Sequence, residues 1–195
     1  HTGIRDRERR VFFQLPEGMQ HPHTPTHIRL PEIDQNQHPV FNGLMQIAPK
    51  WADIEWIIAH TSLPVILKGI VHPQDTKLAL QYGVQGLIIS NHGGRVLDTC
   101  ISPLTALQLI KKVVPTDFPL ILDGGIRRGS DVFKAIALGA TAVCIGRPYI
   151  YGLATAGALG VAHVLKILKE EFEITMALMG TATVNDINQK HILHN

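Results

Sequence analysis

The sequence predicts an α/β fold of four strand–helix units, which together form the second half (strands five to eight) of a (β/α)8 TIM barrel. Three observations support this prediction. Four short apolar runs are continuous rather than alternating, as is typical of parallel strands covered on both faces. Helical patterns separate the runs. Each run ends at a polar residue or a glycine, so the candidate chemistry collects at the carboxyl ends of the strands.

The predicted strands occupy residues 64–68, 86–90, 119–123 and 142–146. The residues at or next to their ends (Lys68, Ser90, Asp123 and Ile145) are spaced by 22, 33 and 22 positions, which are the lengths of complete strand–helix repeats. A whole barrel typically needs about 250 residues. Four repeats therefore correspond to half a barrel.

An open, doubly wound four-stranded sheet is the competing fold, because it would show the same alternation of strands and helices. In such a sheet, ligands gather mainly at one switch point. Here all four strand ends carry candidate functional residues, and this favours the barrel.

The helices are predicted from apolar spacing and from residues typical of helix ends. Pro73 begins one helix and Gly83 follows its end. Ser102 caps a second helix that begins at Pro103, and Ser130 is expected to cap a third that ends at Gly139. The spacing of apolar residues also predicts a helix containing Trp51, Ile54 and Ile58, and a last helix from about Leu153 to Phe172.

We expect one domain over residues 1–195. Residues 16–49 are rich in Pro, His, Gln and Asn and predict a long mobile loop, and residues 50–195 hold the four units and a C-terminal helix. The chain opens on His1 rather than Met, which suggests that the sequence begins partway through a longer protein.

Composition narrows the class of protein. A net charge of +2 and 17% charged residues give no indication of a nucleic-acid or membrane partner. No uninterrupted apolar run reaches the roughly 18 residues needed to span a bilayer, and no signal-peptide pattern is present. The two cysteines form neither a disulfide framework nor a zinc pattern, so a reducing, cytoplasmic location is expected. The histidines of residues 21–38 lack metal-ligand spacing, so no metal site is predicted.

Two glycine-rich loops are candidates for binding a phosphate. Residues 123–129 (DGGIRRG) follow the third predicted strand, and Gly146, Arg147 and Pro148 follow the fourth. Glycines let the backbone approach an anion closely, and barrels commonly bind phosphate in the loops after strands seven and eight. The candidate ligands are Gly124, Gly125, Arg127, Gly146 and Arg147.

A third loop, Ser90-Asn91-His92-Gly93-Gly94-Arg95, follows the second strand. Histidine titrates near neutral pH and suits a general base. The planar guanidinium of arginine matches a carboxylate. Lys68, after three buried aliphatic residues, needs a polar partner. Either it reaches solvent at the barrel mouth or it contacts a cofactor.

Together these motifs resemble the FMN-dependent 2-hydroxy-acid oxidase family, which includes glycolate oxidase, lactate oxidase and flavocytochrome b2. The resemblance implies that His92 is the catalytic base and that Arg95 and Arg5 bind the substrate. Lys68 would lie at the flavin ring near N1 and O2, with Ser90 beside the flavin. The phosphate end of FMN would be held by Asp123, Gly124, Gly125, Arg127, Gly146 and Arg147.

The family resemblance implies oxidation of a small L-2-hydroxy acid, glycolate or L-lactate, to the 2-keto acid. The reduced flavin would be reoxidised by O2, giving hydrogen peroxide, or by another acceptor. A homo-oligomer, a tetramer in the family, is expected.

Strands one to four of the family barrel are absent, together with the aspartate expected to orient His92. If the chain is the entire protein, we expect weak turnover and a tendency to associate, because a half-barrel leaves sheet edges open. Two alternatives are another FMN- or phosphate-binding barrel enzyme and an inactive half-barrel that only binds a ligand or another chain.

Overall fold

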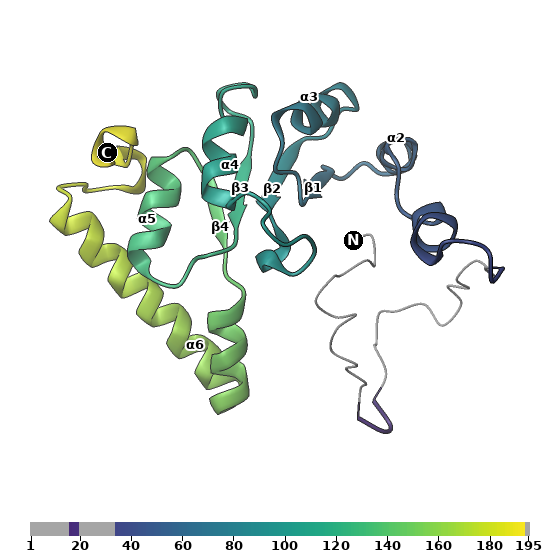
Figure 1. Ribbon diagram of the computed structural model, residues 1–195. Helices are drawn as coiled ribbons and strands as arrows, with labels where there is room; N and C mark the ends of the chain where they lie inside the picture. The colour runs from purple at the N-terminus through teal and green to yellow at the C-terminus, as the bar shows by residue number, and fades with distance from the viewer. Residues whose placement is uncertain (1–15, 20–33, 194–195) are drawn as a thin grey trace.

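The computed structural model describes residues 16–19 and 34–193 of the chain (Figure 1). Four strands alternate with helices. The strands are β1 (Ile66–Lys68), β2 (Gly86–Ser90), β3 (Leu120–Asp123) and β4 (Ala142–Cys144). The α-helices are α2 (Trp51–Ala59), α3 (Pro73–Gln81), α4 (Pro103–Ile110), α5 (Gly129–Ala137) and α6 (Arg147–Leu178). Short helical turns are η1 (Pro39–Gly43), η2 (Leu44–Gln46), η3 (His92–Gly94), η4 (Val184–Asp186) and η5 (Gln189–His191).

The topology of the sheet distinguishes the two folds that the sequence left in competition. All three strand pairs are parallel, and the strand order is β1-β2-β3-β4. Because parallel crossovers are right-handed, strands added always in the same direction place every helix on the same face. In Figure 1, α3, α4 and α5 lie on the same side of the sheet. A doubly wound sheet reverses direction and has helices on both faces. The half-barrel prediction is confirmed.

The strand register separates a buried face from a more open one. On the helix side, Leu87 pairs with Leu120 and Ile89 with Leu122, and all four side chains are fully or almost fully buried. On the other face, Lys68 pairs with Ile88, and both side chains are partly or largely accessible. The core therefore lies between the sheet and its helices. The open face corresponds to the interior of a complete barrel.

Local sequence signals account for the starts of α3 and α4. Pro73 is the first residue of α3, and Gly83 follows the helix with φ of +81°. The hydroxyl of Ser102 accepts a hydrogen bond from the Thr105 N–H at 3.1 Å, which caps α4. The helices predicted over these residues are confirmed.

The start of α5 differs from the prediction. Ser130 lies inside the helix, and the cap residue is Arg128. Asp131, the third residue of α5, accepts the backbone N–H of Arg128 at 3.0 Å. Ser130 therefore lies too far into the helix to cap it, and the prediction that Ser130 caps the helix is wrong. Gly139 follows the end of the helix with φ of +105°, as expected.

Helix α6 begins six residues earlier than predicted and ends six residues later. It breaks at Ala156 and Gly157, whose backbone angles are not helical. Its two segments form a V (Figure 1) and touch where a Cβ on Gly160 would lie 1.9 Å from the Gly152 carbonyl oxygen. By length and composition, α6 is apolar enough to cross a membrane. Glycines and charged residues interrupt this segment, and the break at Ala156 and Gly157 divides it into two helical pieces.

The predicted loop over residues 16–49 contains short helical structure where it is described. The turns η1 and η2 follow one another between Pro39 and Gln46. Helix α2 begins five residues after η2.

Candidate functional site

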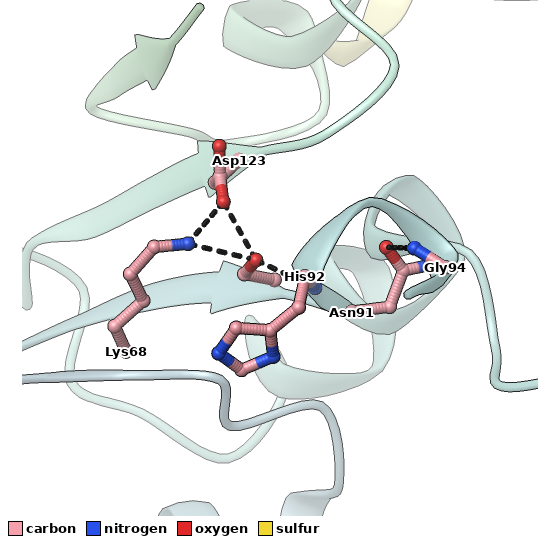
Figure 2. A network of polar contacts seen from close by, with 6 residues as sticks. Lys68, Asn91, His92, Gly94 and Asp123 are labelled. Atoms are coloured by element: carbon pink, nitrogen blue, oxygen red, sulfur yellow. Dashed lines mark hydrogen bonds and ion pairs between the residues drawn. The ribbon is translucent and has the colours of Figure 1, made fainter. Parts of the chain in front are cut away.

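The carboxyl ends of the strands bring together three polar side chains that are far apart in the sequence (Figure 2). Lys68 ends β1, and its ammonium donates a hydrogen bond to the Ser90 hydroxyl at 2.9 Å and forms an ion pair with Asp123. The Ser90 hydroxyl in turn donates to Asp123 Oδ2 at 2.6 Å. This geometry follows from the register, because Ser90 and Asp123 are direct partners across β2 and β3. The charged Lys68 side chain, which was predicted to need a polar partner, therefore has one in the carboxylate of Asp123.

The electrostatics of this triad favour an ionised Asp123. Burial raises the pKa of its carboxyl group. Hydrogen bonds from Lys68 and Ser90 and the positive charge of Lys68 outweigh that effect, so the pKa lies below its ordinary value. The neighbouring thiol of Cys144 shifts the other way. Burial and then the charge of Asp123 raise the Cys144 pKa.

The turn after β2 is held by short-range hydrogen bonds. Ser90 Oγ accepts the backbone N–H of His92 at 3.0 Å, and the Asn91 side chain accepts the Gly94 N–H at 3.3 Å. His92 has φ of +56°, a left-handed conformation that costs a non-glycine residue about 1–3 kcal/mol and that clusters at functional sites. The hydrogen bonds of the turn therefore hold His92 in a strained backbone conformation.

Gly69 makes room for that imidazole. A Cβ at Gly69 would lie 2.6 Å from His92 Cε1, and the φ of Gly69 is +103°. The sequence showed a glycine directly after Lys68, but pattern alone gave no reason for it. The contact with a side chain 23 positions later is visible only in the structure.

A cavity of about 370 Å³ lies beside the turn, at the carboxyl ends of β3 and β4. Its polar lining is basic, and no carboxylate lines it among the described residues. The side chains and glycines that line it include His92, Arg95, Gly124, Gly125, Arg127, Gly146 and Arg147. Such a lining is complementary to anions, since charge-assisted hydrogen bonds to guanidinium groups are among the strongest in proteins.

All the predicted site residues except Arg5 lie at this edge of the sheet, either in the triad or around the cavity. Arg5 lies outside the described residues. Asp123, predicted to help hold a phosphate, has its side chain bonded to Lys68 and Ser90. Among the described residues, no group of three or more His, Cys, Asp or Glu side chains could hold a metal ion.

The fold and the site define the class of protein: half of a (β/α)8 barrel, with a histidine turn and a cavity lined by arginines at the carboxyl ends of its strands. The chain matches the model of the FMN-dependent dehydrogenases over residues 1–194, and it belongs to this family.

Relatives and solved structures agree with this assignment. The chain is 46% identical over 190 residues to a 2-hydroxyacid oxidase of Dictyostelium discoideum, covering 97% of this chain and 49% of that protein. It is 46% identical to an L-lactate oxidase of Roseobacter sp. (strain GAI101), covering 95% of this chain and 51% of the relative. A mandelate oxidase variant with benzaldehyde matches with a TM-score of 0.74 at 37% identity, over 94% of this chain and 49% of that one. The chain spans about half the length of the curated relatives named here.

Proposed function

We propose that this chain carries out the FMN-dependent oxidation of a small L-2-hydroxy acid, glycolate or L-lactate, to the 2-keto acid, with reoxidation by O2 to give hydrogen peroxide. One observation carries the proposal. His92 and Arg95, a base and a carboxylate-binding group, line the same cavity as Arg127 and Arg147. The family and the names of the relatives support it.

The residues around the cavity fit the phosphate end of FMN. Gly125 and Gly146 have open space where a Cβ would stand, so an anion could approach their backbone. Arg127 and Arg147, from the loops after β3 and β4, both line this cavity and supply cations. Together these groups would hold a phosphate dianion without a metal ion.

The chain's other groups would then act on the substrate. Arg95 would bind the substrate carboxylate through its planar fork and orient the 2-hydroxyl toward His92. The His92 imidazole would accept a proton from the substrate as the alcohol becomes a ketone. Bound FMN supplies the acceptor for the two electrons released. Lys68, held by Asp123 and Ser90, would keep a positive charge beside the reaction.

The test is to reconstitute the chain with FMN and to add glycolate, L-lactate or (S)-mandelate without oxygen while recording the visible flavin absorbance. We expect bleaching with glycolate or L-lactate, and stoichiometric hydrogen peroxide when O2 is admitted. His92→Ala should keep FMN and stop the bleaching. A chain that binds FMN and remains yellow with every acid would contradict the proposed oxidation. A chain that takes up no FMN would contradict the cofactor assignment.

We also propose a cytoplasmic location and a homo-oligomeric state. Both cysteines are free and partly accessible, which suits a reducing compartment. The open face of the sheet exposes 42% of Ile66, and such apolar surface favours association. Cell fractionation and light scattering coupled to size exclusion test the two points. Recovery in a secreted fraction or a monomeric mass would contradict them.

A further inference from the structure

Two adjacent arginines in the loop after β3 have different surroundings. Arg127 lines the basic cavity. Arg128 instead donates a hydrogen bond to Glu171 Oε1 at 2.8 Å, and Glu171 is in the second segment of α6. The other carboxylate oxygen of Glu171 accepts the backbone N–H of Gly129 at 2.9 Å. One carboxylate therefore binds both the side chain and the backbone at the end of this loop.

A second carboxylate, that of Asp131 in the first turn of α5, binds the same stretch of backbone. Asp131 Oδ2 accepts the N–H groups of Arg127 at 3.1 Å and Arg128 at 3.0 Å. Three consecutive backbone donors at the start of α5 are thus bound by carboxylates of the protein itself. An external anion cannot use them. The open backbone beside the cavity is that of Gly125 and Gly146, next to the side chains of Arg127 and Arg147.

Helices α5 and α6 are in backbone contact at Gly129. We call the bonds from Glu171 to Arg128 and Gly129 the clamp. A Cβ on Gly129 would lie 2.0 Å from the Phe172 backbone nitrogen, so only glycine permits this approach. Gly129 itself is buried, and Glu171 is only 27% exposed. The end of the loop is therefore fixed on α6, while the Arg127 side chain is free to face the cavity.

We propose that Glu171 is a positioning residue for the cofactor phosphate: by binding Arg128 and Gly129, it fixes the loop of residues 124–128 so that Arg127 and the loop backbone face the phosphate. This inference rests on the proposed function for the identity of the ligand. The clamp itself is independent of that identity.

The direction in which Glu171→Gln changes FMN affinity distinguishes a positioning role of Glu171 from a purely electrostatic effect of its charge. Glu171 is negative, and removing a negative charge near a dianion should by itself tighten binding. If Glu171 positions the loop, Glu171→Gln should instead weaken FMN binding, by roughly fivefold, the scale of one charge-assisted hydrogen bond at a partly exposed site. Riboflavin lacks the phosphate, so its affinity should change less than twofold.

Matched controls lie on the same helix. Glu173→Gln and Glu170→Gln remove the same charge, but within the described part of the chain the ion pairs of these residues are with Lys169 and Lys166, one turn away. Both controls should leave FMN binding unchanged or slightly tighter. Arg128→Gln should weaken FMN binding as Glu171→Gln does, and the double variant should be no weaker than the single ones, since the two residues act as a unit.

Two measurements on the whole chain decide the matter: FMN and riboflavin dissociation constants from flavin fluorescence, and amide hydrogen exchange at residues 127–129 without ligand. Faster exchange in Glu171→Gln but not in Glu173→Gln, with a selective loss of FMN affinity, supports the proposal. Unchanged exchange, tighter FMN binding, or equal weakening of FMN and riboflavin would overturn it. If the parent chain binds no FMN, the proposed function fails and the phosphate role with it. The exchange data would still show whether the clamp exists.

Discussion

Arg147 Nη2 donates a 2.9 Å hydrogen bond to the carbonyl oxygen of Gly93, although 54 residues separate them. The bond joins the loop after β4 to the histidine turn after β2. Gly93 has φ of +68°, and a Cβ there would lie 3.3 Å from the same guanidinium nitrogen. A residue expected to bind phosphate therefore also supports the backbone next to His92. Under the proposed function, one guanidinium group would therefore link the cofactor phosphate to the turn that carries His92.

This link predicts a double effect of Arg147→Lys. Lysine keeps the charge but lacks the planar fork that can bond a phosphate and a carbonyl together. We expect FMN affinity to fall about tenfold, a loss of about 1.4 kcal/mol. We also expect slower anaerobic flavin reduction by L-lactate at saturating FMN, because the histidine turn loses its support. Titration of flavin fluorescence and stopped-flow absorbance measure the two effects.

Arg127→Lys is the matched control for that experiment. Arg127 lines the same cavity, but no described hydrogen bond joins its side chain to the histidine turn. We expect weaker FMN binding with an unchanged reduction rate at saturation. If both variants slow reduction equally, the bond between Arg147 and Gly93 has no role in placing His92.

Gly69→Ala should displace the His92 imidazole while leaving its chemical identity unchanged. The new methyl group would stand 2.6 Å from His92 Cε1, so the imidazole must move. We expect reduction of bound flavin to slow at least tenfold while FMN binding is retained. Gly83→Ala is the control, because Gly83 has φ of +81° and open space around it. It carries the left-handed cost of about 1–2 kcal/mol without the clash. Comparable reduction rates for the two variants would show that Gly69 does not place the imidazole.

The ion pair between Lys68 and Asp123 predicts a dependence of stability on pH. Burial raises the pKa of Asp123, but hydrogen bonds from Lys68 and Ser90 and the positive charge of Lys68 outweigh it, so the pKa in the folded chain is below the ordinary value of 3.8. Its contribution is therefore complete above about pH 4–5 and is lost as the pH falls through the lowered pKa. Asp123→Asn should cost about 1–3 kcal/mol at pH 7 and progressively less below pH 4. Urea unfolding at several pH values measures the difference. A cost that stays constant down to pH 2 would contradict the ion pair.

Much of this architecture was predictable because the signals for it are local. Continuous aliphatic runs located the four strands, and Ser102 with Pro103 located the start of α4. The strand ends gathered the site because parallel strands share an edge. What escaped prediction depends on contacts between distant residues. The partner of Lys68 is 55 positions away, that of Arg128 is 43 positions away, and the ring beside Gly69 belongs to another turn. No periodicity in the sequence encodes such contacts.

Ser102 and Ser130 were both predicted as helix caps, but only Ser102 is the cap residue of its helix, and mutation can test this difference. Ser102 Oγ accepts the Thr105 N–H at 3.1 Å, whereas Ser130 lies within α5, where Asp131 bonds the backbone at the start of the helix. Ser102→Ala should therefore destabilise the chain by about 1 kcal/mol, the usual cost of losing a cap. Ser130→Ala should change stability by less than about 0.5 kcal/mol, because Ser130 is not the cap residue and alanine has the higher helix propensity. Asp131→Ala should cost more than Ser130→Ala, because it frees the N–H groups of both Arg127 and Arg128. Chemical denaturation of the three variants decides the point. A Ser130→Ala cost equal to that of Ser102→Ala would mean that Ser130, rather than the Asp131 carboxylate, caps α5.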